Sequence, residues 1–575
     1  MPREEMDANL PRVEAARVAS FLTHAEGVQM AKKPRLKSGF TLGGEQAEAD
    51  PLLDEAFFES SDYSVIESKT DPRSFVIGRT GSGKSAALQQ LEERFEGHVI
   101  RINPEDLSLP YITDLQVIRY LDELDVNLDL FWIALWKHVL LVEIIRHRYS
   151  VSGPAAKQKF LQSIRDRISR DPAKIAALDY LDEFEGRFWC ETDERVREIT
   201  DKFVRQVGQG AAVEAGAGSA KGRISAQRNS VQSTETRAEQ ADRFQRVVNL
   251  TQLAKLNKMI AVLNEDILDE QHFTYVIIDD LDRDWVDERL SNDLIRCLFR
   301  TVLDLKRVQN LKVLVALRTN IYHELEFKRR AAGQEEKVRA LALQLRWTRE
   351  DLQGLLDERV RAQAPAFDMS AQSLADLLPN TNRTRGNPVD YILDRTLMRP
   401  RDAIAFANEC FRAGIGASRL SWEQIKSAER EYSAKRLLAL RDEWNSSFPG
   451  IEEVLQKFRG CGGRITRRQL EAILDDCALL ISNREFPGVR WLTEASSCLW
   501  GPGADYSWFD LYQPLVFRLY EIGFLGCAAR PNATPSFFQD DPQFVNLERN
   551  LGEDSMYFVH RTYQAALDVR ISGLA

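Results

Sequence analysis

The sequence predicts an α/β protein built on a parallel β-sheet that helices cover on both faces. Continuous apolar runs at 74–77, 275–278 and 312–317 are separated by helical patterns, and such runs are typical of strands buried on both faces. The first run leads directly into a glycine-rich loop and an amphipathic helix. With 575 residues, 44% of them hydrophobic and 29% charged, the chain is long enough for several domains with apolar cores.

Shorter apolar runs at 98–102 and 343–347 predict two further strands. Thr348 with Asp351 forms a capping box that starts a helix, and Thr466 with Gln469 forms another. The predicted segments are a loosely ordered N-terminal segment (1–45), the first part of the sheet domain (46–120), a helical insertion (121–266) with a mobile Gly-, Ala- and Ser-rich loop (207–232), the second part of the sheet domain (267–347), a helical lid (348–444) and a C-terminal module (445–575).

The composition excludes several classes of protein. The net charge of -10 excludes a basic coat for nucleic acid at the level of the whole chain. No two of the seven cysteines form a C-x-x-C pair, so neither a zinc ribbon nor a disulfide framework is indicated, and a reducing cytoplasm is expected. The apolar segment 128–145 is interrupted by Lys137, His138 and Glu143, which predicts a buried helix of a helical bundle and no membrane association.

A glycine-rich loop that follows the first apolar run fits the pattern G-x-x-x-x-G-K-[ST] at every position. The glycines let backbone N–H groups converge on phosphate oxygens, and the following helix adds the positive end of its dipole. In such a loop Lys84 supplies a charge to the β- and γ-phosphates, and Ser85 supplies a hydroxyl ligand to Mg²⁺. The predicted nucleotide-binding residues are Gly78, Arg79, Thr80, Gly81, Ser82, Gly83, Lys84 and Ser85.

Two carboxylates, Asp279 and Asp280, end the second long apolar run. Beside a phosphate loop, Asp279 is expected to hold the Mg²⁺ shell through water, and Asp280 to orient or activate the attacking water. Aspartate is also common in turns, so a solvated strand end is the alternative. The presence of a second acidic residue, Asp280, favours an enzyme that hydrolyses its nucleotide over a nucleotide switch with slow hydrolysis.

The base of the nucleotide is expected to be adenine. The segment 257–260 resembles the N-K-x-D reader of guanine, but Ile260 stands where the aspartate would accept the guanine N–H groups. ATP and Mg²⁺ are therefore the expected ligands.

Three arginines are further candidates. Arg318 follows the third long run, where a basic group can sense the γ-phosphate, although a simple strand exit is the alternative. Arg399 and Arg401 flank Pro400 at a helix start, and either can reach back from a lid to the nucleotide. Solvent-facing arginines explain the same pattern.

Basic residues also gather in the C-terminal module. Arg464, Arg467 and Arg468 lie at the start of one helix, as in a helix that contacts nucleic acid. Asp475 and Asp476 on the same helix favour a solvated charged face instead. We therefore expect DNA binding to be weak at most.

Together these motifs resemble a group of bacterial P-loop ATPases related to the KAP, STAND and origin-recognition branches of the AAA+ ATPases. The resemblance rests on GRTGSGKS, VIIDDLDRDW, KVLVALRTN and LMRPRDAI and covers about residues 50–440. It implies an AAA+-like P-loop NTPase core with Arg318 as a first sensor and Arg399 or Arg401 as a second. It also implies a winged-helix-like C-terminal module, to which GRITRRQLEAIL and YFVHRTYQAAL are similar.

The expected function is an ATPase in which ATP binding closes the lid on the core and hydrolysis releases it. Relatives of this kind suggest a homo-oligomer, an effector protein as partner, and a place in bacterial anti-phage defence. KAP proteins often carry transmembrane helices between the two ATP motifs, whereas here that interval reads as a soluble insertion. Two alternatives stay open: a DNA loader of the origin-recognition kind, and a scaffold with a structural nucleotide.

Overall fold

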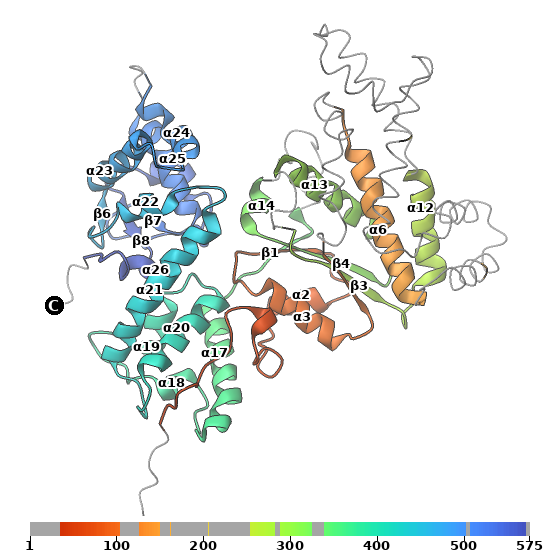
Figure 1. The fold of residues 1–575 in the computed structure, drawn as a ribbon, viewed down its shortest axis with the longest axis horizontal. Coiled ribbons are helices and arrows are strands. Elements are labelled where there is room, and N and C mark those ends of the chain that lie inside the picture. Colours follow the sequence, from red (N-terminus) through yellow and green to blue (C-terminus); the bar gives the residue numbers. More distant parts are fainter. Residues whose placement is uncertain are drawn as a thin grey trace, which may run out of the picture.

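The computed structural model describes residues 35–103, 126–149, 253–281, 288–324, 339–501 and 506–570, with the single residues Gln162 and Arg205. The predicted mobile loop at 207–232 and most of the predicted insertion lie outside these residues. The sheet domain forms one side of the molecule, and the lid and C-terminal module form the other (Figure 1).

Five parallel strands form the sheet, in the order β2-β3-β4-β1-β5. Their bounds are β1 Phe75–Ile77, β2 Val99–Ile102, β3 Thr274–Ile278, β4 Leu311–Leu317 and β5 Ala342–Gln344. Strand β4 lies between β1 and β3, with Leu317 beside Ile77 and Val315 beside Ile278. The loops after these three strands therefore meet at one edge of the sheet, and the predicted parallel α/β core is confirmed.

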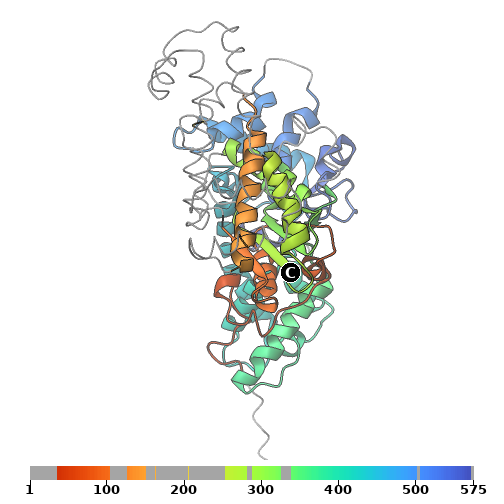
Figure 2. The ribbon, with the colours of Figure 1, turned by 90° about the vertical axis from the view of Figure 1, so that its right-hand side faces the viewer.

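Helices cover both faces of the sheet. Val315 and Leu317 of β4 point into a core with α6 (Asp129–Tyr149), α12 (Leu253–Val262) and α13 (Glu288–Leu305). Leu314 and Ala316 point to the other face, covered by α2 (Ser61–Glu67) and α3 (Lys84–Arg94). The helix at 128–145 is buried as predicted, but it packs on the sheet beside α12, so it belongs to the sheet domain rather than to a separate insertion (Figure 2). None of the described helices has the length and apolar character of a membrane span.

The lid is a helical bundle. It contains α17 (Arg349–Gln363), α18 (Leu374–Leu377), α19 (Pro388–Leu393), α20 (Pro400–Ala413) and α21 (Trp422–Trp444). The predicted capping box of Thr348 and Asp351 starts α17. The expectation of a loosely ordered segment up to residue 45 is wrong for its last part. Leu36, Phe40 and Leu42 are buried in the lid core because their apolar side chains fill it.

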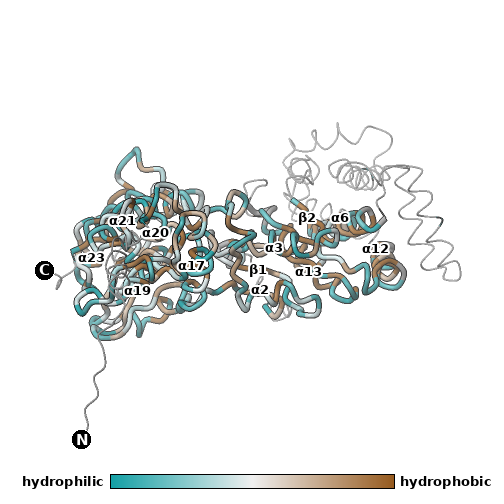
Figure 3. Tube along the Cα trace, turned by 90° about the horizontal axis from the view of Figure 1, so that it is seen from below, coloured by the Kyte–Doolittle hydropathy of each residue, from teal (hydrophilic) through white to brown (hydrophobic). Residues whose placement is uncertain are grey.

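The C-terminal module combines short helices with a three-stranded antiparallel sheet in the order β6-β8-β7. Its elements are α22 (Ile451–Gln456), β6 (Ile465–Thr466), α23 (Arg467–Ala478), α24 (Val489–Ala495), α25 (Trp508–Glu521), β7 (Leu525–Ala528), β8 (Met556–Val559) and α26 (Arg561–Gln564). The predicted capping box at Thr466 starts α23. The end of α21 contributes Leu437, Leu440 and Trp444 to the core of this module. Helix α21 therefore joins the lid to the module, and both lie on the side away from α6 and α12 (Figure 3).

Candidate nucleotide-binding site

The glycine loop connects β1 to α3 and has the backbone that its sequence requires. Gly81 and Gly83 have φ of 78° and 93°, in the left-handed region that favours glycine. A Cβ on Gly78 would lie 2.3 Å from the hydroxyl of Ser82. Side chains at these positions would therefore strain or fill the loop.

The polar groups of the loop suit an anionic ligand. The Lys84 ammonium donates to the carbonyls of Gly78 at 2.8 Å and Arg79 at 3.3 Å, and so lies across the loop. The Ser82 hydroxyl is buried and has no hydrogen-bond partner within the described part of the chain. A buried polar group of this kind needs a partner from elsewhere, such as a ligand or water.

Ser85 and Asp279 meet at the edge where β1 and β3 end. The Ser85 hydroxyl donates to the carboxylate of Asp279 at 3.3 Å, and Asp279 is buried. The guanidinium of Arg101, from β2, lies 3.7 Å from the same carboxylate oxygen. A hydroxyl and a carboxylate are hard oxygen donors, which Mg²⁺ prefers, so these residues fit the metal that the loop motif implies.

Asp280 and Arg318 lie at the same edge. Asp280 has φ of 58°, and its N–H donates to the Asp279 carboxylate at 2.9 Å. Aspartate tolerates this left-handed conformation better than most residues. Arg318 directly follows β4, whose Leu317 carbonyl accepts from the N–H of Gly78 at 3.1 Å. The chain thus brings the loop, both carboxylates and Arg318 to one edge of the sheet.

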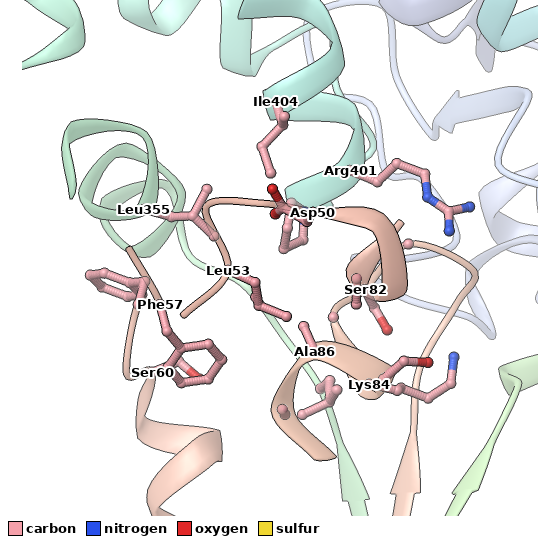
Figure 4. A pocket seen from close by; sticks show the side chains of 18 of the residues that line it. Asp50, Leu53, Phe57, Ser60, Ser82, Lys84, Ala86, Leu355, Arg401 and Ile404 are labelled. Atoms are coloured by element: carbon pink, nitrogen blue, oxygen red, sulfur yellow. The ribbon is translucent and has the colours of Figure 1, made fainter. Parts of the chain in front are cut away.

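A cavity adjoins the loop between the N-terminal segment, α3 and the lid. Leu53, Phe57 and Leu355 line its apolar part, whereas Lys84 and Arg401 lie toward its other side (Figure 4). An apolar wall next to a phosphate loop suits a flat base whose phosphates reach the loop.

The two candidate lid arginines differ in position. Arg401 lines the cavity, and its Nε donates to the carbonyl of Glu45 at 2.9 Å. A Cβ on Gly81 would come within 2.8 Å of the Arg401 Cβ. Arg401 therefore lies directly against the loop.

Arg399 is buried and is not among the residues that line this cavity. It pairs with Asp402 at 2.8 Å and Glu443 at 3.4 Å, and it donates to the carbonyl of Thr80 at 3.0 Å. Burial alone would lower the pKa of Arg399, but the charges of Asp402 and Glu443 raise it, so the guanidinium stays charged. Arg399 thus contacts the loop backbone in place of the expected phosphate.

Sequence reasoning missed two contacts of the loop. The indole N–H of Trp347 donates to the carbonyl of Ser82 at 2.8 Å. The Arg79 side chain leaves the loop and donates to the carbonyl of Ile522, at the end of α25, at 2.8 Å. Burial and the charge of Arg399 lower the pKa of Arg79. No local sequence signal predicts either contact, because both join segments far apart in the chain.

Comparison with known proteins gives distant relatives. Residues 350–441 match a family model described as the FunZ-associated C-terminal helical domain. An 80.3 kDa protein of transposon gamma-delta from Escherichia coli is 22% identical, over 93% of this chain and 68% of that protein. Among solved structures, a Walker-type ATPase of Pyrococcus abyssi matches at 10% identity and a TM-score of 0.36, covering 94% of this chain and 99% of that one. The Aeropyrum pernix Orc1 protein in complex with DNA matches at 12% identity and a TM-score of 0.29, covering 89% and 96%.

Both TM-scores are low, so the fold of the sheet domain is identified from its strand order and its phosphate loop. A parallel sheet, with β4 between the strand of the loop and the strand of the carboxylates, makes the sheet domain a P-loop NTPase core.

Proposed function

We propose that the chain binds ATP with Mg²⁺ and hydrolyses it. The observation that carries the proposal is the approach of Ser85 to Asp279 at the mouth of the glycine loop. A hydroxyl and a carboxylate from separate strands meet there, where a Mg²⁺ ion between phosphates and protein would sit. Mg²⁺, when bound, would neutralise phosphate charge.

The residues of the chain divide the remaining work. Lys84 would leave the carbonyls of Gly78 and Arg79 for the β- and γ-phosphates. Asp280 would orient a water molecule and accept its proton as the water oxygen attacks the γ-phosphorus and the bond to ADP breaks. Arg318 and Arg401 would offset the charge of the γ-phosphate.

The test is calorimetric titration of Mg·ATP into the full chain and into Lys84→Ala. We expect the variant to lose measurable binding while it stays folded, because Lys84 is the first residue of α3 and its side chain lines the cavity rather than the core. Lys457→Ala, an exposed lysine of the C-terminal module, is the matched control and should bind as the wild type does. Wild-type affinity in Lys84→Ala would remove the proposal.

The C-terminal module is proposed to be winged-helix-like and to contact protein. Its strand order places α25 directly before the β7–β8 pair, where a winged helix carries its recognition helix. On α25, Arg518 pairs with Glu521, and Arg467 of α23 lies 4.4 Å over the ring of Trp508. Arg464, just before α23, and Arg468, in its first turn, are exposed, as are Asp475 and Asp476 farther along the same helix. The mixed charge of this face supports weak DNA binding at most.

The wider role is a nucleotide switch that acts through an oligomer or an effector protein. The direct contact of the C-terminal module with the loop, through Arg79, supports a switch. The link to anti-phage defence is implied by the family resemblance alone.

A further inference from the structure

The glycine loop is held from its outer side by two residues at the base of the lid. The indole N–H of Trp347 donates to the carbonyl of Ser82 at 2.8 Å, and the guanidinium of Arg399 donates to the carbonyl of Thr80 at 3.0 Å. Trp347 directly precedes the cap of α17, and Arg399 is the N-cap residue of α20. Two lid helices thus begin at a contact with the loop.

These contacts fix the direction of two backbone donors. A peptide unit is planar and trans, so the carbonyl of one residue and the N–H of the next point in opposite directions. A Ser82 carbonyl held by Trp347 aims the N–H of Gly83 away from the indole. A Thr80 carbonyl held by Arg399 likewise aims the N–H of Gly81 away from the guanidinium.

Gly81 and Gly83 are the residues of the loop that most need such a constraint. Both have left-handed φ, and glycine has more backbone freedom than any other residue. Without outside contacts, their peptide planes can turn and point carbonyl oxygens at the phosphates.

Both donors are themselves held in place. Arg399 is fixed by Asp402 and Glu443. The ring of Trp347 lies 6.2 Å from that of Phe58, and a Cβ on Gly83 would be 3.5 Å from the indole. Neither donor is free to follow a turning peptide.

We propose that Trp347 and Arg399 are positioning residues that pre-orient the N–H groups of Gly83 and Gly81 toward the phosphates of the nucleotide. The proposal rests on the nucleotide-binding function proposed above and assigns Arg399 a part other than that of a phosphate sensor. The lid thereby contributes to binding through the loop backbone.

The N–H groups of such a loop cradle the α- and β-phosphates, which ATP and ADP share. Loss of the Trp347 donor should therefore weaken both nucleotides by the same factor. One neutral hydrogen bond corresponds to about a fivefold change in affinity.

The experiment compares Trp347→Phe with the wild type by calorimetric titration of Mg·ADP and Mg·ATP. Phenylalanine keeps an aromatic ring but removes the donor and part of the ring volume, so the control must make the same truncation elsewhere in the lid. Trp422→Phe is the matched control, because Trp422 is buried in the lid and its indole N–H has no partner within the described residues. We expect about fivefold weaker binding of both nucleotides in Trp347→Phe, and no change in Trp422→Phe.

The Tm of each variant without nucleotide distinguishes a positioning role from a general loss of stability. General destabilisation would lower the Tm but would not change the affinities for Mg·ADP and Mg·ATP. Arg399→Lys, which keeps the charge beside Asp402 and Glu443, should also weaken both nucleotides. Unchanged affinities in Trp347→Phe, or a loss confined to ATP, would overturn the inference while the proposed function stands. A wild-type chain that binds neither nucleotide would overturn the proposed function itself.

Discussion

Arg79 connects the phosphate loop to the C-terminal module, and Arg79→Ala tests whether the two are energetically linked. The guanidinium donates to the carbonyl of Ile522 at 2.8 Å. Gly523 follows with φ of 77°, and a Cβ there would lie 2.6 Å from Nη1 of Arg79. The module thus has a glycine at a position where a side chain would clash with the arginine.

The magnitude follows from two opposing terms. A hydrogen bond from a charged donor contributes about 1.5–3 kcal/mol. Against this, burial opposes the charge of Arg79, and its Nη1 has no hydrogen-bond partner in the described part of the chain. We therefore expect a net loss of about 1–2 kcal/mol in the docking of the module, because the desolvation cost is removed together with the bond.

Hydrogen exchange at the junction of α25 and β7 measures this loss. The N–H groups of Gly523 and Phe524 donate to the carbonyls of Tyr520 and Leu519, so their protection reports whether this end of the module opens. A loss of 1–2 kcal/mol should speed their exchange by about 5–30-fold. Arg467→Ala, which truncates an arginine of the same module over the ring of Trp508, should leave these amides unchanged. Equal protection in Arg79→Ala and the wild type would refute the linkage.

Two further predictions concern single side chains. Asp280→Asn should keep the affinity for nucleotide and slow hydrolysis by about 10²–10⁴-fold. Asparagine can adopt the left-handed φ of this position, but its side-chain amide cannot accept the proton of the attacking water. Unchanged turnover in a phosphate-release assay would mean that Asp280 serves only the turn. His560 is buried, its Nδ1 accepts from the N–H of Thr562, and burial lowers its pKa to about 3. The folded chain therefore keeps His560 neutral, while the unfolded chain protonates it below a pKa of about 6.5. The contribution of neutral His560 to the free energy of unfolding is therefore fully present above that pH. It falls as the pH drops toward 3, and about 2 kcal/mol of it is lost at pH 5. His560→Asn should flatten the change in Tm between pH 7 and pH 5, and an identical slope in both chains would contradict this reasoning.

The sheet and the loop could be predicted from the sequence because their signals are local. An apolar run followed by G-x-x-x-x-G-K-[ST] specifies a strand, a turn that only glycines allow, and a helix start within a dozen neighbouring positions. The caps at Thr348 and Thr466 are local in the same way, since each pairs with a residue three positions on. Burial of 128–145 also followed from composition, but its place on the sheet did not.

The lid contacts could not be predicted, because they depend on which way a side chain leaves a helix start. Arg399 and Arg401 are two positions apart and looked equivalent in the sequence. In the structure Arg399 is the N-cap residue of α20 and turns to Thr80, whereas Arg401 lies within the first turn and lines the cavity. Trp347 meets Ser82 across 265 positions of the chain. Such pairs arise from tertiary packing, which no local pattern records.

The ion pairs around α20 bear on how the lid can move. Asp402 is fully buried and pairs with Arg399 and with Arg436 of α21, which also binds Glu45 of the N-terminal segment. Removing one partner of a buried pair costs about 3–5 kcal/mol, because it leaves a charge uncompensated. Arg399 and Asp402 both lie at the start of α20 and move together, so a swing of the lid away from the loop would pull Arg399 from the Thr80 carbonyl and lose a hydrogen bond from a charged donor, about 1.5–3 kcal/mol. A lid that separates from the loop and closes again on ATP therefore costs more free energy than a lid that moves together with the loop. A nucleotide that moves the loop should carry α20 and α21 with it, and through α21 the C-terminal module, whose core begins at the end of that helix.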